Sequence, residues 1–295
     1  MRRVVLAVAV VTVAACGDQA ARTTTDGPAP DSDQRYTATA MVLESPDHGP
    51  QLCLGGVEDS LPPQCGGPDI PNWSWDDVDD FESAGGTTWG GYTVVGTYDG
   101  EDFTLTEQPT PPAEPDDPVD PVDPQFWTPC DEPPGGWTVV DEATATEKAM
   151  TAAIEYASSQ PDHAGTWLDQ SMNPALSGDT GIADAEIEAA ANDPTELILN
   201  FRFAGDLERH EREPREIWGG ALCVTRAEHT EAELRDVQRR LHGELGDDVL
   251  GSGIDVPIGY VELMVVVDDG SLQRELDEQY GEGVVRVHSA LRPVG

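Results

Sequence analysis

The sequence is short of positively charged side chains. Its 295 residues include 16 Lys and Arg against 57 Asp and Glu, a formal net charge of −41, and the only lysine is Lys148. Residues 36–147 contain no Lys or Arg against 24 acidic side chains. Such a surface repels phosphate backbones and anionic headgroups. The composition therefore predicts no nucleic-acid partner, and it leaves solubility, adaptation to high salt and collection of divalent cations as explanations of the acidity.

Short motifs of catalytic sites are also absent. The chain has no G-x-S-x-G, no Walker A loop and no G-x-G-x-x-G after a strand. No pair of histidines has the H-E-x-x-H spacing of a zinc site; the six are His48, His163, His210, His229, His242 and His288. We therefore predict no catalytic residue and no cofactor. The alternative is a cell-envelope hydrolase whose site is assembled from distant residues.

The chain has no apolar run long enough to span a bilayer as a helix. The longest, Val4 to Ala14, fits the core of a signal peptide, and Arg2 and Arg3 precede it. It leads into Val13-Ala14-Ala15-Cys16, which resembles the lipobox of bacterial lipoproteins. The alternative is an ordinary secretory signal with a chance cysteine.

The lipobox resemblance implies cleavage after residue 15, acylation of Cys16, and a membrane-anchored protein facing the extracytoplasmic side. Two acyl chains make a stable anchor. Loss of two arginines leaves 14 basic against 57 acidic residues, a net charge of −43. The composition resembles that of lipoproteins from high-GC Gram-positive bacteria, and the resemblance extends to no functional family.

Four cysteines remain after Cys16. An even number in an oxidising compartment predicts two disulfides, and we favour Cys53–Cys65 with Cys130–Cys223 among the three possible pairings. A metal or redox pair at Cys53 and Cys65 is the alternative, but the spacing does not match C-x-x-C. Asp47 and His48 near Cys53 then form a turn between two strands rather than a catalytic group with a thiolate.

Proline and composition divide the chain into segments. Residues 107–125 contain seven prolines and are typical of an extended polyproline II linker. Residues 16–34 have little apolar content and indicate a flexible lipidated tether. The sequence thus predicts two domains: a small β domain over 35–106 and an α+β domain over 126–295.

The first domain is predicted to be a small all-β barrel, of the OB or SH3-like kind. Its clearest signal is a hairpin around Asp99-Gly100, a pair suited to a two-residue type I′ turn. The Cys53–Cys65 bridge would staple this small core.

The second domain alternates helical and strand patterns. Met150, Ala153, Ile154 and Ala157 form an apolar helical stripe, and residues 196–203 alternate as a strand with Leu197, Leu199, Phe201 and Phe203 on one face. Thr230 and Glu233 form a capping box, and Leu272, Leu276 and Tyr280 mark another helix. The order β-β-α-β-α-β after residue 195 predicts one antiparallel or mixed sheet, in a ferredoxin-like arrangement.

Three groups of residues are candidate binding sites. An acidic loop has the oxygen ligands that Ca²⁺ prefers, although it lacks the EF-hand register and a solvated loop is the alternative: Asp76, Asp77, Asp79, Asp80 and Glu82. Trp73 and Trp75 form either a ligand-stacking platform or core packing. Arg209, Arg212 and Arg215, at helical spacing, form either a contact for an acidic partner or a mixed-charge segment that joins two strands.

These observations favour a non-enzymatic binding or structural protein of the cell envelope. Its partner would be a protein, a glycan or an ion, and its membrane contact would be the lipid anchor. The sequence does not indicate the ligand or the oligomeric state.

Overall fold

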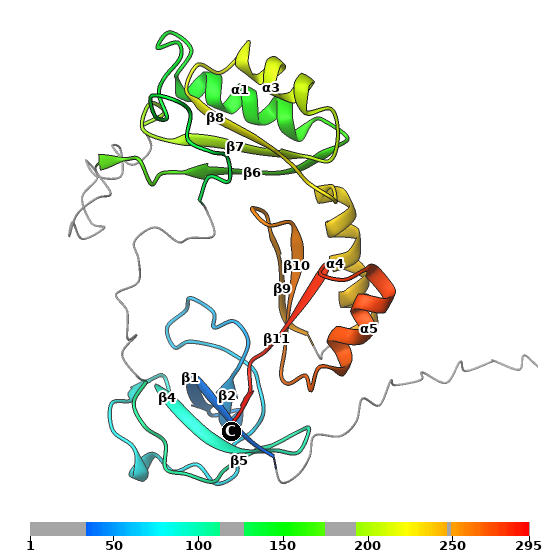
Figure 1. Ribbon diagram of the computed structural model, residues 1–295. Coiled ribbons are helices and arrows are strands. Elements are labelled where there is room, and N and C mark those ends of the chain that lie inside the picture. Colours follow the sequence, from blue (N-terminus) through cyan, green and yellow to red (C-terminus); the bar gives the residue numbers. More distant parts are fainter. Residues whose placement is uncertain (1–33, 113–126, 175–192, 247–248, 295) are drawn as a thin grey trace, which may run out of the picture.

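The computed structural model describes residues 34–112, 127–174, 193–246 and 249–294, which form four α-helices and three β-sheets (Figure 1). The helices are α1 (Glu147–Ser158), α3 (Leu207–Arg215), α4 (Glu231–Leu245) and α5 (Ser271–Tyr280). The strands are β1 (Arg35–Ser45), β2 (His48–Cys53), β3 (Glu82–Ala84), β4 (Thr87–Tyr98), β5 (Phe103–Leu105), β6 (His163–Asp169), β7 (Ile198–Phe203), β8 (Ala221–Arg226), β9 (Val249–Asp255), β10 (Tyr260–Val265), β11 (Val285–Ser289) and β12 (Arg292–Pro293).

Several predicted features lie outside the described residues. They are the signal peptide, Cys16, the tether up to residue 33, and linker residues 113–125. Within the part of the chain that is described, no helix is long and apolar enough to cross a membrane.

The first sheet has six strands in the order β12-β1-β4-β3, with β2 paired to β1 and β5 paired to β4. The longest pairing in this sheet is the antiparallel ladder of β1 and β4, which runs from Arg35↔Thr97 to Glu44↔Thr88. Alternate residues of these strands, such as Val42 and Val94, are buried in one core. The predicted barrel is wrong: the pairings among the described residues do not close, because β3, β5 and β12 are too short to bridge the edges.

The end of the chain returns to this first sheet. β12 pairs antiparallel with the start of β1, and Leu291 just before it is fully buried in the same core as Val42. The start of the proline-rich segment also contacts this sheet, since Thr110 exchanges backbone hydrogen bonds with Thr93. No local pattern in the sequence predicts either contact.

Residues 147–289 form two α/β units with the same chain order. The first α/β unit contains α1, β6, β7, α3 and β8, and the second contains α4, β9, β10, α5 and β11. In each, a helix precedes two antiparallel strands, and a second helix leads to a strand parallel to the middle one. Figure 1 shows the two units as separate helix-covered sheets.

The predicted single ferredoxin-like sheet is therefore wrong. The structure has two mixed sheets of three strands, β6-β7-β8 and β11-β10-β9. The sequence analysis missed β6 and β9 because glycines at 165, 251 and 253 interrupt their hydrophobic pattern. Each missed strand supplies the third strand of its sheet.

Many local predictions are confirmed. Leu197, Leu199, Phe201 and Phe203 lie together in the core under α1, and both hydrogen bonds of the Thr230–Glu233 capping box are present. The hairpin around Asp99 also forms, but the prediction of a two-residue type I′ turn is wrong. Tyr98 pairs with Phe103, which leaves a four-residue loop, and the Asp99 carboxylate accepts from the backbone N–H groups of Glu101 and Asp102.

Candidate functional site

The acidic loop does not assemble a metal site. Among the described residues, no group of three or more His, Cys, Asp or Glu side chains is placed to hold a metal ion. The tryptophans beside this loop are partly buried and pack against the core of the first sheet. The rings of Trp73 and Trp75 lie 5.3 Å apart, Trp73 contacts Tyr92, and Trp75 Nε1 donates to Glu44 at 2.6 Å.

The arginine-rich segment forms α3, which joins β7 to β8, and two of its arginines make hydrogen bonds within the first α/β unit. Arg209 donates to Gln160 at 2.9 Å and lies 3.9 Å from Asp162. Arg215 donates to the backbone carbonyl of Gly220 at 2.5 Å. The side chain of Arg212 is 63% exposed and lies 3.8 Å from Glu213. Two of them thus stabilise the first α/β unit.

Both predicted disulfides are present. Cys53 and Cys65 have Cα atoms 5.6 Å apart, and Cys130 and Cys223 have theirs 5.8 Å apart. Disulfides persist in oxidising, extracytoplasmic compartments. Asp47 lies in the β1–β2 turn and His48 begins β2, where its Nδ1 contacts the Gly49 carbonyl at 2.7 Å.

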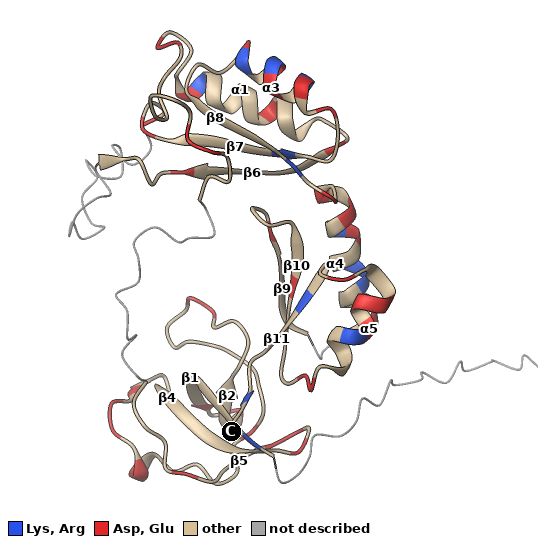
Figure 2. Cartoon of the chain, viewed as in Figure 1, with Lys and Arg blue, Asp and Glu red and all other residues tan. Residues whose placement is uncertain are grey.

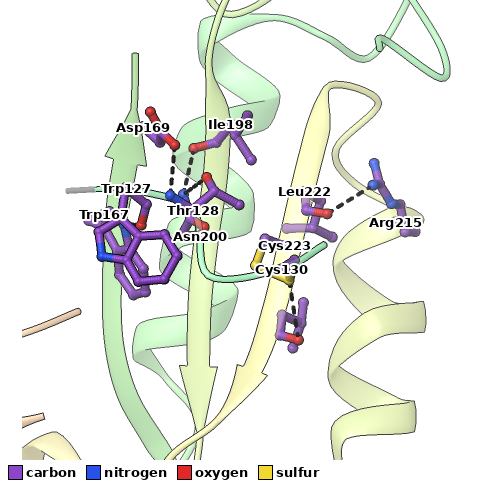
Figure 3. Close-up of a disulfide and its surroundings, with 11 residues drawn as sticks. Trp127, Thr128, Cys130, Trp167, Asp169, Ile198, Asn200, Arg215, Leu222 and Cys223 are labelled. Carbon is purple, nitrogen blue, oxygen red and sulfur yellow. Dashed lines mark hydrogen bonds between the residues drawn. A yellow bond between two sulfur atoms is a disulfide. The ribbon is translucent and has the colours of Figure 1, made fainter. Parts of the chain in front are cut away.

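The Cys130–Cys223 bridge attaches the segment from residue 127 to the open face of the β6-β7-β8 sheet (Figure 3). In that segment the backbone N–H of Thr128 donates to Asp169 at 2.7 Å, and its hydroxyl accepts from the buried side chain of Asn200 at 3.1 Å. Trp167 Nε1 donates to the Trp127 carbonyl. The segment therefore supplies further hydrogen bonds to buried polar groups of this sheet.

A buried polar network joins α1, α3 and the loop before β6. His210 is fully buried and stacks on Phe203, with ring centroids 3.6 Å apart. Its Nε2 lies 3.0 Å from Asp162 Oδ2, and its Nδ1 lies 3.0 Å from the Tyr156 hydroxyl. Tyr156 also donates to Glu213 at 2.7 Å.

The environment of this network shifts its pKa values. Burial and the hydrogen bond to Glu213 raise the pKa of Tyr156 to about 12. Burial alone would raise the pKa of Asp162, but the contact with His210 and the charge of Arg209 lower it overall. Because His210 has no exposed surface, a substrate does not reach its ring. The network therefore holds α3 against α1.

A cavity of about 440 Å³ lies where the two α/β units meet. Ligand sites commonly have volumes of this order. Arg202 and Arg226 contribute from β7 and β8 of the first unit, and Gly259, Tyr260 and Arg286 contribute from the second. His229 lies in the connection between the units. We call this cavity, whose lining also includes Glu228, Ile258 and Glu282, the arginine pocket.

The arginine pocket brings three arginines together on a very acidic protein. Figure 2 shows how few basic positions the chain has and how widely acidic ones are spread. Ion pairs within 4.0 Å among the described residues include none with Arg202, Arg226 or Arg286. Burial lowers the pKa of Arg202, although the charges of Asp255 and Glu228 oppose the shift.

Sequence reasoning missed this pocket. Its residues come from separate segments that share no short-range motif. The one local signal is the density of arginine at the ends of apolar strands, in a chain with so few cations.

Comparisons with known proteins do not identify the chain. No protein-family model matches it, no curated protein matches it, and no solved structure matches it.

Proposed function

We propose that this protein is a lipid-anchored, extracytoplasmic lipoprotein of the cell membrane that binds a ligand in the arginine pocket without altering it chemically. The lipobox at residues 13–16 supports the anchor, and the two disulfides suit an oxidising compartment. The observation that carries the binding function is the pocket itself, about 440 Å³ in volume and formed where two units meet. Ligand sites often occupy such junctions.

The anchor is tested by Cys16→Ser. The variant should leave the membrane fraction and lack acyl chains, because the acylated thiol is missing. Acylated Cys16→Ser protein would contradict the lipoprotein assignment.

The binding function is tested by filling the pocket. Ile258 lies at the cavity and is 50% exposed, so Ile258→Trp would narrow the entrance with little effect on the core. The matched control is Val57→Trp in the first sheet's region, at 42% exposure. Thermal unfolding is followed with inorganic phosphate, succinate, glucose, a chito-oligosaccharide, spermidine and Ca²⁺, since a ligand that binds the folded state raises Tm. A stabilisation lost in Ile258→Trp and kept in Val57→Trp supports the function. Equal stabilisation of both variants, or none by any solute, contradicts it.

A hydrolase is the second candidate, because the same cavity also contains His229, Glu228 and Glu282. Against it, no hydrogen bond or ion pair of the described residues joins His229 to either glutamate, whereas a general base is normally held by a partner. Hydrolysis of purified cell-wall material that disappears in His229→Ala would favour the enzyme over the binding protein.

A further inference from the structure

The charge of the arginine pocket differs in sign from that of the rest of the protein. Its lining includes three arginines and two glutamates, Glu228 and Glu282, which gives a formal charge of +1 with His229 neutral, whereas the chain as a whole carries −41. Both glutamates are exposed, as are Arg226 and Arg286, whereas Arg202 is partly buried. In a chain with so many carboxylates, three arginines in one cavity without an ion-pair partner leave hydrogen-bond donors for a ligand.

Arg202 is held in place by the backbone around it. Its Nη1 donates to the carbonyl of Val256 at 3.2 Å, and Gly259 lies against the guanidinium. A Cβ at position 259 would approach Arg202 Nη1 to 2.6 Å, and the φ of +88° there favours glycine. The glycine therefore makes room for the guanidinium, which has further N–H groups beyond the one bound to Val256.

Arg286 is oriented by an aromatic ring. Its guanidinium carbon lies 3.8 Å from the centroid of the Tyr260 ring, which is itself buried. Stacking on a ring face fixes the plane of a guanidinium and leaves its N–H edge free to donate. Arg226 donates one bond, to the Ala204 carbonyl at 3.3 Å. Arg202 and Arg286 are thus held by a backbone carbonyl and an aromatic ring, and neither has an ion-pair partner within 4.0 Å among the described residues.

We propose that the arginine pocket binds a small solute that carries an oxyanion group, a carboxylate or a phosphate, with Arg202 and Arg286 as its main contacts. This inference rests on the proposed binding function and names the chemical class of the ligand. The planar fork of a guanidinium matches two oxygens of either group, and such charge-assisted bonds are strong. The acidic surroundings disfavour long polyanions, so the ligand is small enough to be enclosed by the cavity.

The experiment titrates the full-length chain in detergent with inorganic phosphate and, separately, with succinate, using isothermal calorimetry. We expect saturable binding of at least one, weakened at least tenfold in Arg202→Gln and in Arg286→Gln. The side chain of Arg239 is 68% exposed on α4. The matched control is Arg239→Gln, which removes the same charge outside the pocket. Its affinity should stay within twofold of the wild type.

Arg202 also bonds to Val256, so thermal unfolding is used to check that Arg202→Gln is folded. If that variant is unfolded, Arg286→Gln alone decides the test. If only phosphate or only succinate binds, the result identifies which of the two oxyanion groups the pocket recognises. Equal affinity of all three variants for an oxyanion would overturn the inference. If a neutral or cationic solute binds and is blocked by Ile258→Trp while neither oxyanion binds, the ligand class is wrong and the proposed binding function stands.

Discussion

The two α/β units share one chain order but are stabilised by different interactions. Buried positions of β7 and β10 correspond at a constant separation of 62 residues (261 minus 199, for example): Leu199 with Val261, Phe201 with Leu263, and Phe203 with Val265. The same separation relates the following helices, where His210 and Pro214 of α3 match Leu272 and Leu276 of α5. The topology is thus repeated while the side chains are not.

The first unit has a core of large aromatic side chains and a covalent bridge. Phe201, Phe203 and Trp218 are fully buried there, and Cys223 in β8 is bonded to Cys130. The second unit has a core of Leu and Val side chains, and both described disulfides lie outside it. This αββαβ order therefore needs neither the bridge nor the aromatic rings to form.

His210 is the sharpest difference between the two units. It is fully buried, and the corresponding Leu272 makes an apolar contact in the second unit. The topology therefore does not require a polar group at this position. A buried histidine must be compensated by partners, which Asp162 and Tyr156 provide in the first unit only.

The largest expected effect comes from removing the bridge of the first unit. Cys130→Ala with Cys223→Ala should lower the free energy of unfolding by about 4 to 5 kcal/mol, because the bridge closes a long loop, with a sequence separation of 93. Denaturant unfolding measures this loss. Hydrogen exchange should show lower protection in β6, β7 and β8 and unchanged protection in β10.

The matched control for this prediction is the shorter bridge of the first sheet. Cys53→Ala with Cys65→Ala removes a separation of 12 and should cost about 3 kcal/mol. An equal loss of protection in both α/β units after removal of Cys130–Cys223 would show that the units do not differ in the way described above.

The second prediction makes the first unit more like the second. His210→Leu should cost about 2 to 3 kcal/mol, because it removes the contacts of the buried imidazole with Asp162 and the Tyr156 hydroxyl. Urea unfolding measures the cost. Adding Asp162→Ala should recover part of it, since removing both partners is less costly than removing one.

The corresponding control is Leu272→Met, which conserves volume and should cost less than about 1.5 kcal/mol. If His210→Leu proves as mild as Leu272→Met, the polar network does not hold α3 in place.

The third prediction concerns pH and His163, which lies in β6 with its Nδ1 3.1 Å from Glu231 of α4. Burial lowers the pKa of His163, although Glu231 opposes the shift. Below its ordinary pKa of about 6.5 the unfolded chain therefore takes up this proton more readily than the folded one. The contribution of neutral His163 to the free energy of unfolding is fully present above that pH. It falls as the pH is lowered, until the pH passes below the pKa of His163 in the folded chain.

Urea unfolding at pH 7, 6 and 5 should show this loss in the wild type and a smaller loss in His163→Gln. His288→Gln, at a 52% exposed side chain, should keep the wild-type profile. Asp162, whose pKa is lowered, adds its own loss only at lower pH, below the ordinary carboxyl range of about 4. A wild-type profile that stays flat from pH 7 to 5 would contradict the role given to His163.

Local patterns in the sequence predicted local structure well. The apolar stripe around Ala153, the alternation of β7 and the capping box at Thr230 each depend on neighbouring residues, and each is present. The disulfide pairing followed from the parity and placement of the cysteines.

Long-range pairing did not follow from the sequence in the same way. Nothing near Arg292 indicates that β12 pairs with β1, more than 250 positions away. β9 carries glycines in place of an alternating pattern, so the second sheet was not recognised. The arginine pocket needs both sheets to be placed, since Arg202 and Arg286 come from different units. Short motifs in the sequence therefore could not predict the arginine pocket.

The smallest expected effect compares the first helices of the two units. Thr146 caps α1 by accepting from the Ala149 backbone N–H, whereas Thr230 caps α4 and Glu233 returns a bond to the Thr230 backbone. Thr230→Ala removes one side of a reciprocal box and should cost about 1.5 kcal/mol, against about 1 kcal/mol for Thr146→Ala. Chemical denaturation at pH 7 measures both. The hydrogen bonds to Thr230 also lower the pKa of Glu233, so this contribution is present above about pH 4.5 and is lost as the pH falls through the folded pKa. The two variants should therefore converge in acid. If Thr230→Ala and Thr146→Ala cost the same at pH 7 as well as in acid, the reciprocal bond from Glu233 adds nothing to the cap.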